Sequence, residues 1–175
     1  MRIAVLTTQT PFITGGAERH AANLVDALAL RGFEACQVTL PFKHYPASVL
    51  IDVLMAARLT DLSDLGYPVD MVVGLKFPAY LVSHPNKVYW VLHQHRQAYD
   101  IWEAGNSELI HDPDGLAARE LIRAEDTAAF TAPGARVYAN SANVAGRMKR
   151  YLGVGSTPLY HPPPNAELMR PGEYG

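Results

Sequence analysis

The sequence has little charge of either sign. Charged residues make up 18% of its 175 residues, and the formal net charge at pH 7 is -2. A surface that binds nucleic acid normally carries a concentrated excess of Lys and Arg, so this balance argues against a nucleic-acid partner. The hydrophobic fraction of 49% indicates a folded domain with a substantial core, and it argues against disorder.

The chain also has very little cysteine. Its single cysteine, Cys36, excludes an internal disulfide bond and agrees with a reducing compartment. Because free cysteines are usually buried, we expect Cys36 to be a small core residue of a strand. The chain starts directly with a strand-like run and has no apolar stretch typical of a secretory signal or a membrane span. We therefore expect a cytoplasmic protein.

Apolar patterning predicts strands that alternate with helices along the chain. The expected strands are 2–8, 34–40, 69–75, 87–93, 135–139 and 157–160. The expected helices are 17–31, a segment from near Ser48 to Ala57, a segment from the turn 111–115 to about Phe130, and Ser141 to Tyr151 with Gly153 as its end. This order predicts an α/β fold: a Rossmann-like, doubly wound parallel sheet with helices on both faces.

The end of the sequence differs in character from the rest. Residues 161–164 read His-Pro-Pro-Pro, which suits neither a helix nor a central strand and favours an extended spacer. We expect one domain over 1–160 and a proline-rich linker over 161–175. Such a linker usually leads to another domain, so we expect a longer protein with a C-terminal domain beyond this chain.

A glycine pair lies between the first expected strand and the first expected helix. Gly15 and Gly16 would let the backbone approach a ligand closely, and the helix N-terminus that follows attracts anions such as a diphosphate. The pattern matches neither the dinucleotide fingerprint nor a Walker loop. The alternative is that the two glycines only make a tight turn.

The first turn of that helix carries three polar residues. Glu18 either complements the helix dipole or accepts a hydrogen bond from a sugar hydroxyl. We expect Arg19 and His20 to be exposed residues of the helix surface.

Two histidines follow the apolar strand 87–93. In an extended strand His93 and His95 would share one face, at the edge where open α/β sheets bind their ligands. Three interpretations remain open: a zinc site, which would need a third ligand that no spacing suggests, a structural histidine, or a histidine that contacts a polyol hydroxyl. Arg96 could pair with a phosphate or a carboxylate.

Other candidate residues have plain structural alternatives. Tyr99 and Trp102 could stack on a sugar face, or they could be ordinary packing residues. Asp112 and Asp114 belong to an Asp-Pro-Asp-Gly turn, so we interpret them as turn and cap residues and not as paired catalytic carboxylates. The sequence contains no nucleophile elbow of the Gly-x-Ser-x-Gly type.

Three motifs in order resemble one enzyme family. The run 11–34 reads PFITGGAERHAANLVDALALRGFE and is similar to the first strand–helix unit of family 4 (group 1) glycosyltransferases. The run 138–153 reads YANSANVAGRMKRYLG, and with the YHPPP at 160–164 it resembles the end of the N-terminal domain in the same family. The resemblance covers nearly the whole chain.

The resemblance implies a two-domain GT-B enzyme that transfers a hexose-like sugar with retention of configuration. This chain would be the N-terminal half, which holds the acceptor, a glycan or a lipid-linked molecule. The donor would be a nucleotide-diphosphate sugar, with no metal and no other cofactor. Gly15 and Gly16 would approach the donor diphosphate and sugar, and His93 would touch the transferred sugar. The resemblance also places Asn140 and Ser141 in a family signature, although a strand end and a helix N-cap explain both residues.

One departure from the family limits the expected activity. The Arg, Lys and Glu-x7-Glu pattern of the family's donor domain does not occur in these 175 residues, so we expect the chain alone to be inactive. The alternative is a stand-alone Rossmann-like binding module without catalysis. A peripheral membrane contact is a further hypothesis, because Arg147, Lys149 and Arg150 could meet anionic headgroups. Such a cluster is also typical of a solvated helix face.

Overall fold

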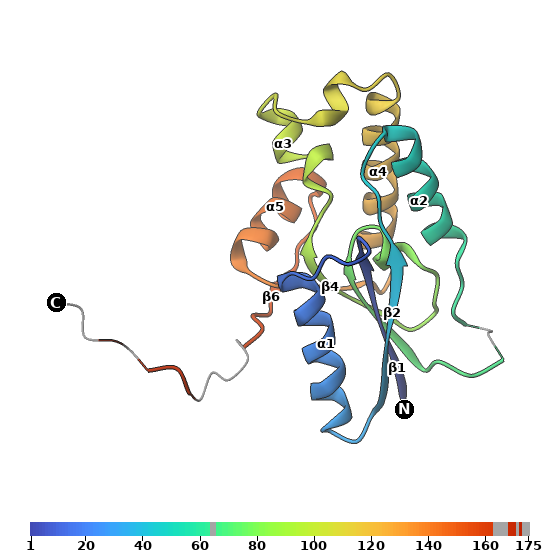
Figure 1. The fold of residues 1–175 in the computed structure, drawn as a ribbon, viewed down its shortest axis with the longest axis vertical. Helices are drawn as coiled ribbons and strands as arrows, with labels where there is room; N and C mark the ends of the chain where they lie inside the picture. The colour runs from blue at the N-terminus through green and yellow to red at the C-terminus, as the bar shows by residue number, and fades with distance from the viewer. Residues whose placement is uncertain (64–65, 163–167, 171, 173–175) are drawn as a thin grey trace.

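The computed structural model describes residues 1–63, 66–162, 168–170 and 172, and its centre is a six-stranded parallel sheet (Figure 1). The strands are β1 (Arg2–Gln9), β2 (Glu34–Pro41), β3 (Met71–Lys76), β4 (Lys87–His93), β5 (Arg136–Ala139) and β6 (Thr157–Pro158). Their order in the sheet is β2-β1-β3-β4-β5-β6. The longer helices are α1 (Gly16–Ala29), α2 (Ala47–Leu59), α4 (Gly115–Phe130) and α5 (Ala142–Leu152). The short helices are η1 (Ala79–Leu81), η2 (Arg96–Ala98), α3 (Asp100–Glu103) and η3 (Glu108–His111).

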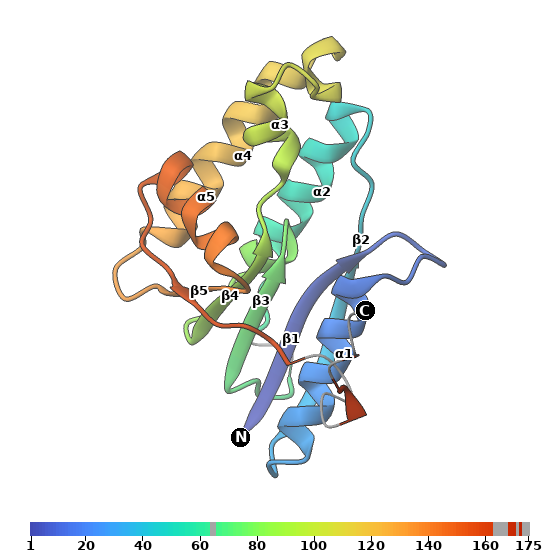
Figure 2. The same ribbon diagram turned by 90° about the vertical axis from the view of Figure 1, so that its left-hand side faces the viewer.

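Helices cover both faces of the sheet, which confirms the predicted doubly wound α/β fold. Figures 1 and 2 show α1 on one side of the sheet and α2 and α4 together on the other. Side chains alternate along each strand: on β1, Val5 packs in the α1 cluster, whereas its neighbours Ala4 and Leu6 pack in the larger opposite cluster. β1 is therefore buried on both faces, which explains its continuous apolar run.

The order of the strands creates one switch point. The chain leaves β1 for β2 on one side and later returns to place β3 on the other side of β1. Because the strands are parallel, their carboxyl ends lie at one edge, and open α/β sheets bind ligands where the connections diverge. The carboxyl ends of β1 and β3 are therefore the expected position of a ligand site.

A buried carboxylate connects α4 with the segments that follow β3 and β4. Asp126 of α4 is fully buried and accepts hydrogen bonds of 2.8 Å from the hydroxyl groups of Tyr80 in η1 and Tyr99 before α3. Burial raises the pKa of Asp126 to about 7, although the two tyrosine hydroxyls oppose this shift. One carboxylate therefore fixes two connections of the sheet.

Two expected burial states are wrong. Cys36 is exposed, because β2 pairs only with β1 and forms the edge of the sheet. His20 is buried at 6% exposure, since its ring packs edge-on against Trp90 and His161, with centroids 4.6 Å apart in both cases. The sequence pattern predicts the helices and strands. It does not predict which strand forms the edge of the sheet or where the chain runs after β6.

Several of the predicted helices and strands have ends that differ from the structure by a few residues. The helix expected at 17–31 ends at Ala29, the strand expected at 69–75 is Met71–Lys76, and the last strand is only Thr157–Pro158. The expected linker at 161–175 is described only in part, because 163–167, 171 and 173–175 lie outside the described residues.

The turn around Asp112 confirms its structural interpretation. One carboxylate oxygen of Asp112 accepts the Asp114 N–H at 2.9 Å, and the other accepts the Ala47 N–H at 2.9 Å. Asp112 thus stabilises its own turn and the start of α2, whereas the Asp114 side chain makes no capping hydrogen bond.

We expect Asp126→Ala to lower the free energy of unfolding by about 3 kcal/mol, because it leaves two buried tyrosine hydroxyls without an acceptor. Urea denaturation measures this change. The exposed Asp52→Ala on α2 is the matched control and should stay within about 0.5 kcal/mol of the wild type. A loss for Asp126→Ala as small as that of the control would contradict the assigned role.

The same carboxyl group predicts a dependence on pH. Its folded pKa of about 7 lies above the unfolded value of 3.8, so the folded state keeps a proton that the unfolded state releases between these values. The contribution of Asp126 to stability is therefore present at low pH and is lost as pH rises from about 4 to about 7. Asp126→Asn should remove this contribution from the pH profile of unfolding, and an unchanged profile would argue against it.

Candidate functional site

The carboxyl edge of the sheet gathers several polar residues from distant parts of the sequence. The loop after β1 contributes Gly15, Gly16 and Glu18, β3 ends with Lys76, and β4 ends with His93. We call these five residues the rim. Lys76 and His93 are register partners at the ends of β3 and β4, beside the switch point.

The Glu18 side chain folds back onto the N-terminus of α1 and binds a backbone N–H there. Its carboxylate accepts a hydrogen bond from the Gly15 N–H at 2.8 Å and forms an ion pair of 3.2 Å with Lys76 Nζ. Burial alone would raise the pKa of Glu18, but these backbone N–H groups and Lys76 lower it. Of the two interpretations of Glu18, the structure therefore favours the complement to the helix end.

The backbone of the glycine pair does not need glycine for a tight turn. Gly15 has an extended φ of -132°, and Gly16 is not among the glycines with positive φ. A Cβ on Gly16 would meet nothing within 4 Å. The space above Gly16 is therefore open, and the fold itself leaves it available to a ligand that approaches the backbone.

Lys76 is the rim residue that the sequence analysis missed. Its Nζ lies 3.2 Å from Glu18 Oε1 and 3.5 Å from the Thr8 carbonyl oxygen, so it bridges the ends of β1 and β3. The signal was present, because a single charged residue ends the apolar run of β3. Only the strand order shows that this end lies next to Glu18.

His93 is half-buried and neutral at pH 7. Burial lowers its pKa, and the nearby cations Lys76, Arg147 and Arg96 lower it further, against a hydrogen bond with Gln94. Its Nδ1 lies 2.9 Å from the Gln94 carbonyl oxygen and must donate its proton there. In this tautomer Nε2 carries a lone pair and can accept a hydrogen bond from a hydroxyl group.

An ion-pair network lies next to His93. Arg96 donates to Asp100 through Nε and Nη2 at 2.9 and 2.6 Å, and Arg147 Nη1 lies 3.9 Å from the same carboxylate. The buried Arg147 Nε has no hydrogen-bond partner among the described residues. Arg96 is thus already paired, and the network adds positive charge around His93.

His95 and Tyr99 do not belong to the rim. β4 ends at His93, and His95 packs between Phe42 and Phe77, where burial lowers its pKa to about 3. Tyr99 is committed to Asp126 by its hydrogen bond, so ordinary packing explains it.

The remaining candidates have structural contacts. The Trp102 ring lies 4.8 Å below the Arg119 guanidinium. The backbone N–H of Asn140 donates to Val91, and Ser141 Oγ caps α5 by accepting the Val144 N–H at 3.3 Å. Over the described ranges, no three His, Cys, Asp or Glu side chains come close enough together to hold a metal ion.

The basic cluster expected on α5 is divided in the structure. Arg150 pairs with Glu103 at 2.9 Å, Arg147 faces Asp100, and Lys149 is exposed. Two of the three cations therefore face carboxylates of α3, which weakens the case for a membrane contact at this helix.

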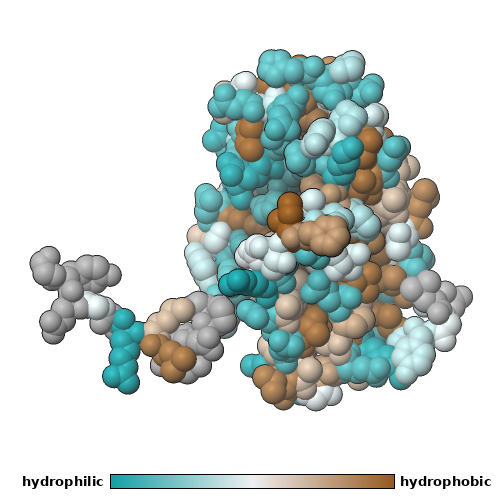
Figure 3. All heavy atoms as spheres, viewed as in Figure 1, coloured by the Kyte–Doolittle hydropathy of each residue, from teal (hydrophilic) through white to brown (hydrophobic). Residues whose placement is uncertain are grey.

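Two exposed apolar residues lie in the loop between β1 and α1. Phe12 is fully exposed with a φ of 66°, and Ile13 is 60% exposed. Apolar side chains appear in the middle of the face in Figure 3, where Figure 1 shows this loop. The loop that carries Gly15 therefore also presents an apolar surface to the ligand side of the sheet.

Comparisons with known proteins give no match to a family model, a curated protein or a solved structure. Among the described residues no helix is long and apolar enough to cross a bilayer.

We expect Lys76→Met to raise the pKa of His93, because it removes one of the cations that lower it. Histidine ring signals in an NMR pH titration measure the change. Lys149→Met removes an exposed lysine of α5 and should leave the titration of His93 unchanged. An unchanged or lowered pKa in Lys76→Met would show that the two residues do not interact as described.

Proposed function

We propose that this chain is the acceptor-side domain of a glycosyltransferase that uses a nucleotide-diphosphate sugar. The order of its motifs resembles family 4, and the site lies where a doubly wound sheet binds ligands. The observation that carries the proposal is the Glu18–Lys76 ion pair at the switch point, next to the neutral His93.

The rim suits the charge of the donor. Lys76, Arg96 and Arg147 surround His93, and their carboxylate partners are Glu18 and Asp100. The excess of one cation favours a diphosphate leaving group, whose negative charge grows as the glycosidic bond breaks. The open space above Gly16 gives this group access to the backbone.

His93 provides the hydroxyl contact in this proposal. Its Nε2 is an acceptor at pH 7, so it can hold a sugar hydroxyl in one orientation relative to the rim. Orientation of the reacting sugar is a large part of the catalytic effect in such transfers. His95, Asn140 and Ser141 act as structural residues around this contact.

The loop between β1 and α1 suits an acceptor with an apolar part. Phe12 and Ile13 are exposed on the same loop that ends at Gly15. An apolar surface beside a polar rim favours a lipid-linked acceptor over a free glycan. The acceptor would then reach the rim from this side.

The test uses the protein expressed from its complete reading frame with a panel of nucleotide-diphosphate sugars and lipid-linked acceptors. His93→Ala should lower kcat/KM for sugar transfer by about 100-fold, because the transferred sugar loses its orienting acceptor. The exposed His111→Ala in η3 is the matched control and should leave transfer unchanged.

The outcomes separate the proposal from its alternative. Equal transfer by His93→Ala and the wild type would remove His93 from the site. Saturable binding of a nucleotide sugar without turnover would favour a binding module of the same fold. Absence of both binding and transfer across the panel would contradict the proposed function.

A further inference from the structure

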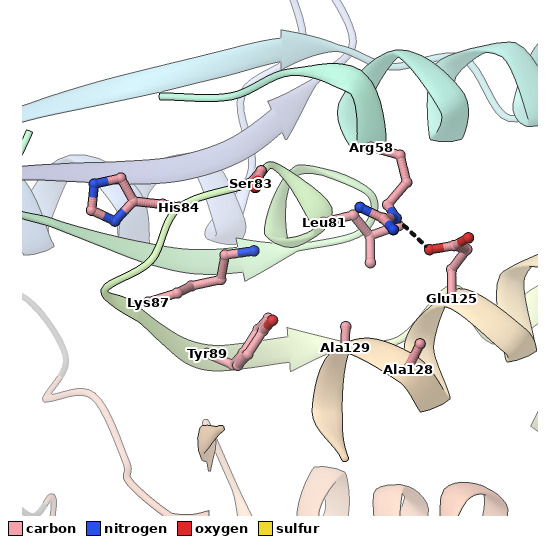
Figure 4. Close-up of a pocket in the computed structure, with 9 residues that line it drawn as sticks. All are labelled: Arg58, Leu81, Ser83, His84, Lys87, Tyr89, Glu125, Ala128 and Ala129. Carbon is pink, nitrogen blue, oxygen red and sulfur yellow. Dashed lines mark hydrogen bonds and ion pairs between the residues drawn. The ribbon is translucent and has the colours of Figure 1, made fainter. Parts of the chain in front are cut away.

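A cavity lies at the opposite edge of the sheet from the rim. It has a volume of about 210 Å³ and opens between α2, α4 and the start of β4 (Figure 4). Its polar lining residues include Arg58, Ser83, Lys87, Tyr89 and Glu125. Lys87 begins β4 and His93 ends it, so the two sites are roughly 20 Å apart along the strand.

Lys87 is a half-buried cation with unused hydrogen-bond donors. Its Nζ donates to the Tyr80 carbonyl oxygen at 3.2 Å and lies 5.3 Å from the centre of the Tyr89 ring. An ammonium group has three hydrogens, so two of them lack a protein acceptor among the described residues. Burial and the charge of Arg58 lower the pKa of Lys87 to about 8, and no carboxylate opposes them.

Arg58 places a second cation at the same cavity. Its Nε donates to Glu125, with an N–O distance of 2.6 Å, and its Nη groups have no acceptor in the part of the chain that the structure describes. Figure 4 shows the charged ends of Arg58 and Lys87 extending toward each other across the pocket. Two facing cations repel, and an anion between them would remove this repulsion.

We propose that this cavity binds a small oxyanion, a phosphate or carboxylate group, between Lys87 and Arg58. The oxyanion accepts the unused hydrogens of the Lys87 ammonium and of the Arg58 Nη groups, as charge-assisted hydrogen bonds. The Ser83 and Tyr89 side chains line the same space and add hydroxyl groups. The site is separate from the rim, so its ligand is not the proposed donor sugar.

Isothermal titration calorimetry with inorganic phosphate tests the proposal on the full chain. The wild type should show saturable binding, and Lys87→Met and Arg58→Gln should each weaken it by at least about tenfold, because each loses charge-assisted hydrogen bonds. Arg58 has an exposed side chain, so Arg58→Gln keeps the test valid if Lys87→Met fails to fold. Lys149→Met should bind like the wild type.

A direct titration of the lysine separates this cavity from other anion sites. In an NMR titration of lysine side chains, phosphate should raise the pKa of Lys87 from about 8 toward its usual range. Lys76→Met changes only the rim, so it should keep the phosphate-induced rise in the pKa of Lys87. No saturable binding by the wild type, or binding that is lost in Lys76→Met but kept in Lys87→Met, would overturn the proposal.

Discussion

The buried carboxylate of Asp126 is the constraint on which the positions of the other polar groups depend. Its two tyrosine donors follow β3 and β4, the strands that end with Lys76 and His93. Tyr80 can fold back over β3 only because Gly74 has no side chain: a Cβ there would lie 2.6 Å from the Tyr80 Cβ. A glycine in a strand and a carboxylate on a distant helix therefore together set the course of the chain directly after the rim.

The rim follows from the parallel sheet and the charges at its edge. Parallel pairing brings the ends of β1, β3 and β4 together, so Lys76 meets Glu18 although the two are far apart in sequence. The same pairing puts positive charge beside His93, and burial with this charge keeps its imidazole neutral. Neutrality is what allows His93 to accept a hydrogen bond, so the electrostatics of the edge and the proposed role of the histidine depend on each other.

The sequence predicted what depends on local pattern. The elements, the doubly wound class and the Ser141 cap follow from periodicity and capping chemistry, and the structure confirms them. Burial of Cys36 and exposure of His20 were wrong, because strand order and the course of the chain after β6 decide both. Lys76 was missed for the same reason: nothing near it in sequence indicates its partner Glu18. A single sequence does not reveal the order of the strands, so it does not predict which distant segments contact each other.

Two half-buried lysines, Lys76 and Lys87, lie at the two ends of the β3–β4 connection and have different partners. Lys76 ends β3 with a carboxylate partner, whereas Lys87 begins β4 with only the Tyr80 carbonyl oxygen. Tyr80 is held at both its hydroxyl and its carbonyl group, by Asp126 and Lys87. Tyr80 therefore connects the cation of the cavity with the segment that follows Lys76, and any coupling between an oxyanion on Lys87 and the rim through Tyr80 would be reciprocal.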